Sequence, residues 1–115
     1  MRAGQVFLNN RFAGTLIEES KKMYIFRYDL GYYNDPSAAA VSLTLPKSSL
    51  EYRSEHLFPF FFNMLAEGVN KELQSRQLRI DKEDSFGLLL ATTGNDTIGA
   101  VTVKPLQDDE LTRDK

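Results

Sequence analysis

Two glycines stand near the end of the chain, in the stretch Gly94-Asn95-Asp96-Thr97-Ile98-Gly99. Glycine-rich loops can cradle phosphate groups with backbone N–H donors, but such a loop leads into the N-terminus of a helix. Here a helix-like segment precedes Gly94 and a strand-like segment follows Gly99, which is the reverse order. The chain also lacks the Walker and dinucleotide-binding glycine motifs and the motif set of a protein kinase. We therefore interpret Gly94 as a helix stop and Asn95-Asp96 as a turn.

The residue types that transfer protons or bind metals are present, but no pattern brings them together. His56 is the only histidine, and nothing in the sequence supplies the nucleophile, carboxylate or further ligands that it would need. The acidic clusters at 82–85 and 108–110 are typical of a helix start and a solvated tail. The sequence therefore predicts no catalytic residue, no cofactor and no metal ligand, and it places His56 on the surface or in a partly packed position.

The composition predicts one globular domain without an electrostatic field for nucleic acid. The chain has 115 residues, 42% of them hydrophobic, and a net charge of −2. It has no cysteine, which removes disulfides and thiolate metal sites and fits the reducing cytoplasm, the location that we expect. The N-terminus lacks the apolar region of a secretion signal, and the longest apolar run, residues 57–65, is too short to span a bilayer.

The first two strands are predicted by alternation around a turn. Gly4–Leu8 and Phe12–Glu18 are short alternating runs, and Asn9-Asn10 lies between them. Asparagine tolerates the left-handed backbone angles that a tight hairpin turn requires. We therefore expect a β-hairpin here.

Two further strands are expected before the helices. Residues 22–28 are rich in aromatic and β-branched side chains, which favour a strand. The segment Val41–Leu45 alternates cleanly and stops at Pro46, so it is predicted as the fourth strand. We expect Leu50–Phe58 to be irregular or a short helical turn.

From Pro59 onward the apolar period changes to that of a helix. Proline suits the first helical position, and helical spacing continues to Leu65. A break is predicted near Glu67-Gly68, after which Val69–Leu78 forms a second helix.

A third helix is predicted within Asp81–Thr93, stopped by Gly94 at the position where helices commonly end. Ile98–Lys104 reads as the last strand. Three residues are candidates for the helix cap: Asp81, Asp84 and Ser85. The whole pattern predicts an α+β fold, in which a small antiparallel sheet packs against about three short helices.

The most unusual feature is the phenylalanine cluster at residues 58–62, which holds four of the eight phenylalanines. On a helix, residues 60, 61 and 62 point in three directions, so they cannot all face one core. Either the helix is enclosed between the sheet and other helices, or one face docks a partner, where aromatic anchors dominate the binding energy. The two interpretations are compatible.

With these motifs, the chain resembles the N-terminal subdomain of HipA-type serine/threonine kinases, the toxins of Hip toxin–antitoxin systems, from about Gln5 to Pro105. The shared stretches are VFLNNRFAGTL, YIFRY, AVSLTLP, FFFNMLAEGVNKEL and DSFGLLLATTGNDTIGAV. The family pattern F-x-N-L-L-P-E-G is matched except at Met64 and Ala66, and residues 94–101 match G-x-D-x-x-G-A-V fully.

A full HipA-type protein continues into a kinase core, whereas this sequence ends at Lys115. The resemblance therefore points to a fragment of such a kinase or to a separate small protein similar to HipS of the HipB–HipS–HipT systems. It implies an antitoxin that docks on a HipT-like serine/threonine kinase and inhibits it non-covalently, together with a HipB-like DNA-binding protein. No direct contact with nucleic acid or membrane is expected.

The resemblance also implies where the partner binds, with the helix break at Met64–Asn70 as the inserted element. The expected partner-binding residues are Phe60, Phe61, Met64, Glu67, Gly68, Val69 and Asn70. Two alternatives stay open: an enzyme with residual nucleotide chemistry, and a domain that bridges kinase and HipB-like protein without inhibiting. We expect residues 1–106 to form the domain and 107–115 a polar tail.

Overall fold

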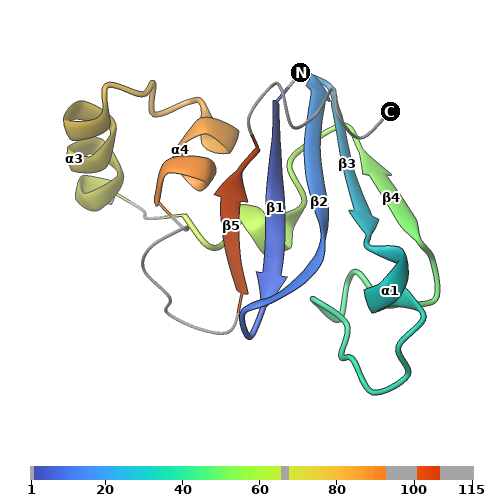
Figure 1. Cartoon of the computed structure of the whole chain (residues 1–115). Coiled ribbons are helices and arrows are strands. Elements are labelled where there is room, and N and C mark those ends of the chain that lie inside the picture. The colour runs from blue at the N-terminus through green and yellow to red at the C-terminus, as the bar shows by residue number, and fades with distance from the viewer. Residues whose placement is uncertain (1, 66–67, 93–100, 107–115) are drawn as a thin grey trace.

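A computed structural model of the chain describes residues 2–65, 68–92 and 101–106. The strands are β1 (Arg2–Leu8), β2 (Arg11–Ser20), β3 (Met23–Tyr28), β4 (Glu51–Ser54) and β5 (Val101–Pro105). The helices are α1 (Leu30–Tyr33), α2 (Pro59–Phe62), α3 (Gly68–Leu78) and α4 (Ser85–Thr92). The strands form one antiparallel sheet in the order β4-β3-β2-β1-β5 (Figure 1). The α+β fold predicted from the sequence is confirmed.

The turn of the N-terminal hairpin lies at Asn9-Asn10, as predicted. Asn9 and Asn10 both have positive φ angles, 52° and 68°. This geometry gives a two-residue turn whose twist matches that of the flanking strands. Beyond the turn, β1 and β2 pair over their length with one irregularity, between Val6 and Phe7.

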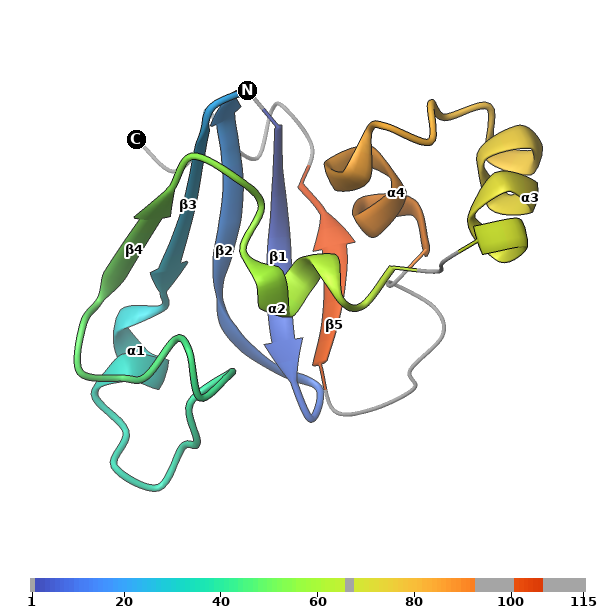
Figure 2. The ribbon, with the colours of Figure 1, turned by 180° about the vertical axis from the view of Figure 1, so that it is seen from behind.

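The helices α2 and α4 cover one face of the sheet, and the core lies between these two layers. Figure 2 shows α2 crossing this face in front of β1, with α4 beside β5. The largest buried side chains come from both layers: Val6, Leu16, Phe26 and Val103 from the sheet, and Phe61, Phe86 and Leu89 from the helices. Sheet and helices therefore share one hydrophobic core.

The prediction of a strand at Val41–Leu45 is wrong. The segment is a loop with one isolated bridge between Ser42 and Leu45. Its backbone groups bond to a side chain instead of to a strand: the Tyr28 hydroxyl donates to the Leu45 carbonyl and accepts from the Val41 N–H. The alternation that suggested a strand arises because Val41 and Leu45 are buried on either side of Leu43, which is 98% exposed.

The fourth strand lies instead at Glu51–Ser54, inside the stretch predicted to be irregular. It pairs with β3 at an edge of the sheet, and Arg27 on β3 donates to the Glu51 carboxylate at 2.7 Å. The strand was not predicted because its charged side chains interrupt the alternation of hydrophobic residues by which strands are recognised. A short, charged strand is a common way to protect a sheet edge from pairing with another chain.

The helical region follows the prediction in outline. Pro59 occupies the first turn of α2, which already ends at Phe62 with Asn63 as its C-cap. The break therefore begins four residues before the predicted Glu67-Gly68, of which Glu67 lies outside the described residues, and α3 begins at Gly68.

Of the three candidate caps for the next helix, Asp84 is the one observed. Its carboxylate accepts the Gly87 N–H at 3.1 Å at the start of α4. The predicted turn and helix stop at 93–97 lie outside the described residues, as does the tail at 107–115. The last strand is described from Val101 to Pro105.

Candidate partner-binding surface

The structure divides the phenylalanine cluster between the core and the surface. Phe61 is completely buried, and its ring lies 5.9 Å from that of Phe26 on β3. Phe58 is also buried, and Phe60 is half-buried with its ring edge-on to Phe61 at 5.2 Å. Only Phe62 is largely open to solvent, with 47% of its area exposed. The cluster thus anchors α2 through Phe61 and leaves Phe62 available for contact.

The other residues predicted to bind a partner lie around the connection between α2 and α3. Met64 is partly buried against the core. Gly68, Val69 and Asn70 begin α3, and Asn70 is exposed. Glu67 lies outside the described residues. Sequence reasoning therefore selected one continuous segment, although Phe61 within it is a core residue in this structure.

Sequence reasoning missed three exposed apolar side chains in this region. Phe62, Leu73 and Leu78 are 47%, 48% and 42% exposed. Phe62 lies beside the first turn of α3, since the Lys71 ammonium is 5.7 Å from the centre of its ring. Leu73 and Leu78 belong to the segment that was predicted as the second helix, Val69–Leu78. No local signal distinguishes a helix that packs on its own sheet from one that projects away from it.

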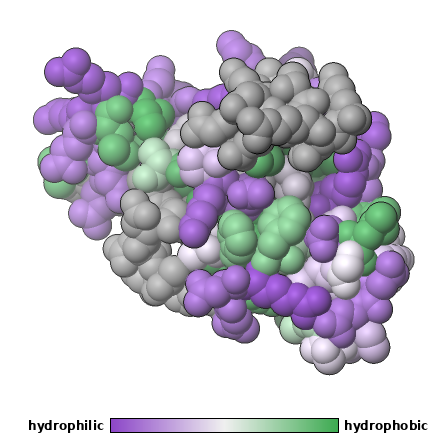
Figure 3. Space-filling model, viewed as in Figure 1, coloured by the Kyte–Doolittle hydropathy of each residue, from purple (hydrophilic) through white to green (hydrophobic). Residues whose placement is uncertain are grey.

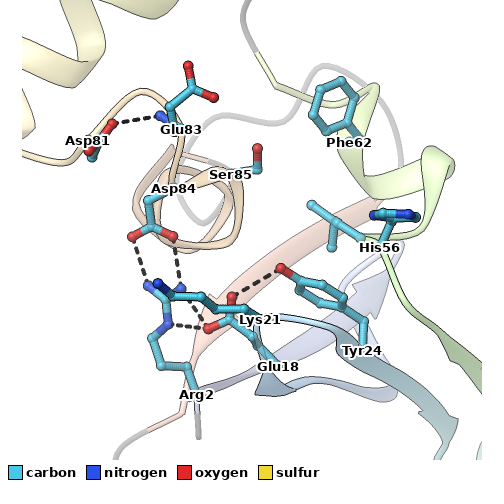
Figure 4. Close-up of a pocket in the computed structure, with 11 residues that line it drawn as sticks. Arg2, Glu18, Lys21, Tyr24, His56, Phe62, Asp81, Glu83, Asp84 and Ser85 are labelled. Atoms are coloured by element: carbon cyan, nitrogen blue, oxygen red, sulfur yellow. Dashed lines mark hydrogen bonds and ion pairs between the residues drawn. The ribbon is translucent and has the colours of Figure 1, made fainter.

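An open groove of about 570 Å³ adjoins Phe62. Figure 4 shows Phe62 and His56 on one side of it and the start of α4, with Asp84 and Ser85, on the other. Arg2 lies directly below Asp84, at the bottom of the view. His56 is exposed, as the sequence predicted, and its backbone N–H donates to the Ser54 hydroxyl at 3.2 Å.

Arg2 connects the sheet to the start of α4. Its guanidinium donates two hydrogen bonds to Asp84, at 2.9 and 2.8 Å, and one to Glu18 at 2.7 Å. The Tyr24 hydroxyl donates to the second oxygen of Glu18 at 3.2 Å. Strands β1, β2 and β3 are thereby joined to α4 through one network of paired charges (Figure 4).

The electrostatics of this network favour a structural role. The hydrogen bonds that Arg2 donates lower the pKa of the Asp84 carboxyl that accepts them, and the same bonds raise the pKa of Arg2. Burial, followed by the charge of Glu18, raises the pKa of Tyr24. Each shift holds the group in its ordinary charge state at neutral pH, whereas a general acid or base needs a pKa near neutrality. The network stabilises the walls of the groove without an evident proton-transfer group.

Neither a metal site nor a membrane span emerges from the part of the chain that the structure describes. No group of three or more His, Cys, Asp or Glu side chains in residues 2–65, 68–92 and 101–106 is placed to hold a metal ion. Within the same residues, no helix is long and apolar enough to cross a membrane.

Comparison with known proteins identifies relatives over nearly the whole chain. Residues 4–104 match the family described as the HipA N-terminal domain. An uncharacterized protein of Haemophilus influenzae is 34% identical over 104 residues, covering 90% of this chain and 92% of that protein. A solved structure described as the N-terminal domain of HipA toxin superposes with a TM-score of 0.69 at 29% identity, covering 94% of this chain and 95% of its own. The matched family is that of the N-terminal domain and not of a kinase domain.

Proposed function

The chain belongs to the HipA N-terminal domain family, and from this premise we propose that it is a binding protein that docks on a HipT-like serine/threonine kinase and inhibits it without covalent chemistry. In this proposal it acts in the cytoplasm as an antitoxin, in a complex that also contains a HipB-like DNA-binding protein. In this complex the kinase is the enzyme, and this chain acts only by binding to it.

The observation that carries the proposal is the exposure of Phe62 at the segment that the family motif marks. Phe61 begins the F-x-N pattern shared with HipA N-terminal domains, and Phe62 is its second, variable position, which stands beside the start of α3. Exposed aromatic side chains near buried ones are effective binding anchors, because they are held rigidly by the core beneath them. Here Phe61 fixes α2 on the sheet, so that Phe62 is presented in a defined position.

Docking also accounts for the groove better than catalysis does. Arg2, which lines it, is already paired with Asp84 and Glu18. The sequence carries no phosphate-binding motif, and we propose that the isolated chain neither binds nor hydrolyses ATP. Isothermal titration calorimetry with Mg²⁺–ATP tests this point, and saturable heat would contradict it.

The main test is co-expression with a HipT-like kinase encoded beside this protein. We expect the two proteins to co-purify and the rate of kinase autophosphorylation to fall in the complex. Phe62→Asp should weaken the complex, whereas Leu43→Asp, at a 98% exposed loop position, should not. If the wild-type chain and the kinase do not co-purify, the proposal is wrong.

A second candidate function is that of a structural domain that bridges the kinase and its DNA-binding partner. It is favoured by the similarity to a domain that forms part of a HipA toxin. The same complex distinguishes the two functions. A kinase that autophosphorylates at its full rate while this chain is bound would support the bridging role over inhibition.

A further inference from the structure

Helix α3 stands apart from the body of the protein. It projects to the side of the sheet beyond α4 (Figures 1 and 2). None of residues 70–78, whose side chains are described, is buried. An isolated helix of 11 residues is marginal in water, since most helical stability in proteins comes from packing of an apolar face. A surface that covers α3 would therefore stabilise it.

Within the described residues, α3 contacts the rest of the chain near its start, at its end and through an ion pair of Glu72 with Lys82 at 3.8 Å, and these contacts leave Leu73 exposed. Near its start, Lys71 lies over the Phe62 ring. At its end, the Ile80 N–H donates to the Ser75 carbonyl at 3.0 Å. Lys71 and Leu73 are separated by about 200° around the helix axis, because each residue turns the helix by about 100°. Leu73 therefore points away from Phe62, which agrees with its 48% exposure.

The outer side of α3 combines apolar and basic groups. Figure 3 shows hydrophobic side chains gathered on α3 among hydrophilic ones. Residues 68–79 contain three cations, Lys71, Arg76 and Arg79, and one anion, Glu72, for a net charge of +2. Since the whole chain carries −2, the rest of it carries −4. The helix itself, Gly68–Leu78, carries Lys71, Arg76 and Glu72 and so a net charge of +1, and Arg79 directly follows it. The segment 68–79 is thus basic in an otherwise acidic protein, and its electrostatic complement is an acidic surface.

Resting on the proposed function, we propose that α3 is a docking helix, which enters an apolar groove of the kinase bordered by Asp and Glu side chains. Leu73 is its anchor, and Arg76, one turn further on the same side, pairs with the acidic margin. The surface is continuous with the segment that the family motif marks, because Gly68, Val69 and Asn70 are the first residues of α3. A single helix face is smaller than a standard interface of about 1,600 Å². The face that carries Leu73 therefore supplies only part of the contact with the kinase.

The test measures affinity of full-length variants for the kinase by biolayer interferometry at two salt concentrations. We expect Leu73→Asp to weaken binding by at least about tenfold, the scale of a lost interface anchor. Leu43→Asp is the matched control, since it places the same substitution at an exposed position on a loop at the other end of the molecule (Figure 1). Arg76→Glu should slow association and reduce the salt dependence of binding.

Four outcomes overturn the inference. If the wild-type chain binds the kinase and Leu73→Asp binds equally well, α3 is not part of the contact, while the proposed function stands. If the wild-type chain does not bind, both fail together. A wild-type dimer that Leu73→Asp dissociates, measured by light scattering, would assign the helix to a second copy of this chain. Saturable binding of a DNA duplex that Arg76→Glu abolishes would assign it to nucleic acid. Circular dichroism of each variant confirms that the fold is retained before affinity is compared.

Discussion

Asp84 performs two separable tasks, and replacing it by two different residues measures each. Its carboxylate caps α4 through the Gly87 N–H and receives two hydrogen bonds from Arg2 on β1. Losing a helix cap costs about 1 kcal/mol of stability. The Arg2 and Asp84 side chains are 41% and 33% exposed, so water screens the pair and its contribution is about 0.2–1 kcal/mol. Asp84→Ala removes both and should cost about 1.5–2 kcal/mol in total.

Asp84→Asn separates the two contributions. Asparagine caps helices about as well as aspartate, so this variant loses the charge and should cost no more than about 1 kcal/mol. Asp81→Asn is the matched control, because the Asp81 side chain accepts the Glu83 N–H and has no ion-pair partner within the described residues. Asparagine retains that acceptor, and stability should change by less than about 0.5 kcal/mol.

The cost of Asp84→Asn should also depend on pH in a defined direction. Hydrogen bonds from Arg2 lower the pKa of Asp84 in the folded protein below the ordinary value of an aspartate side chain. A carboxyl whose pKa is lower in the folded state stabilises that state when it is ionised. This contribution is complete above the unfolded pKa of about 4 and disappears as the pH falls toward the folded pKa. The difference between wild type and Asp84→Asn should therefore narrow below about pH 4.

Urea unfolding followed by circular dichroism, at neutral pH and at several acidic pH values, gives each free energy of unfolding. A loss of about 2 kcal/mol corresponds to a fall in Tm of several degrees for a domain of this size, which thermal scans would detect. Equal destabilisation by Ala and Asn at neutral pH would refute the assignment of Asp84 as a cap. A difference that stays constant from neutral to acidic pH would refute the ion-pair contribution.

Three further predictions follow from the core and the sheet. Phe61→Ala should lower the free energy of unfolding by about 3–5 kcal/mol, as urea unfolding measures it. Phe62→Ala should change this free energy by less than about 1 kcal/mol but should weaken kinase binding, as affinity measurements test. Gly14→Ala should destabilise the protein or prevent its soluble expression, because a Cβ there would lie 2.4 Å from the Arg27 carbonyl oxygen, and an unchanged Tm would contradict this geometry. Tyr28→Phe should cost about 1–3 kcal/mol, since one loop carbonyl and one loop N–H lose their hydroxyl partner in a buried site; a thermal scan measures the effect, and no change would show that water replaces the hydroxyl.

The parts of the fold that were predictable are those specified by adjacent residues. The hairpin depends on the left-handed angles of Asn9-Asn10, and α2 begins where Pro59 suits a first turn. Asp84 was among the candidate caps because a cap is a local hydrogen bond. In each case the chemistry of one or two residues decides the backbone conformation, and no knowledge of distant segments is needed.

The misplaced fourth strand shows what local patterns omit. Val41–Leu45 alternates as a strand does, but the Tyr28 hydroxyl satisfies its backbone groups from β3. Glu51–Ser54 does not alternate in hydrophobicity, but its pairing with β3 includes an ion pair from Arg27 to Glu51. Both outcomes are set by contacts with a strand more than ten residues away in the sequence. A pattern of residue types along the sequence does not include such contacts between distant segments.

The same limit applied to the candidate site. The cluster at residues 58–62 indicated that its phenylalanines cannot all face one core, because adjacent residues of a helix point in different directions, so either the helix is enclosed or one face is open to a partner. It did not indicate which, since that depends on where α2 rests against Phe26 and α4. The predicted partner-binding residues included Phe61 and Phe60 alike, and the tertiary structure distinguishes the two, because Phe61 is buried in the core and Phe60 is half-buried.

Folding stability alone does not explain the apolar residues that remain exposed. A single exposed leucine or phenylalanine is ordinary on a protein surface. Here Phe62, Leu73 and Leu78 lie on either side of one short connection, where α2 ends and α3 projects from the body. Each forgoes roughly half of the 1.5–3 kcal/mol that complete burial of such a side chain contributes. The described residues of α3 bury none of their side chains in return. A partner that covers these side chains would bury their exposed area and gain that free energy. This is the physical reason for proposing the kinase contact there.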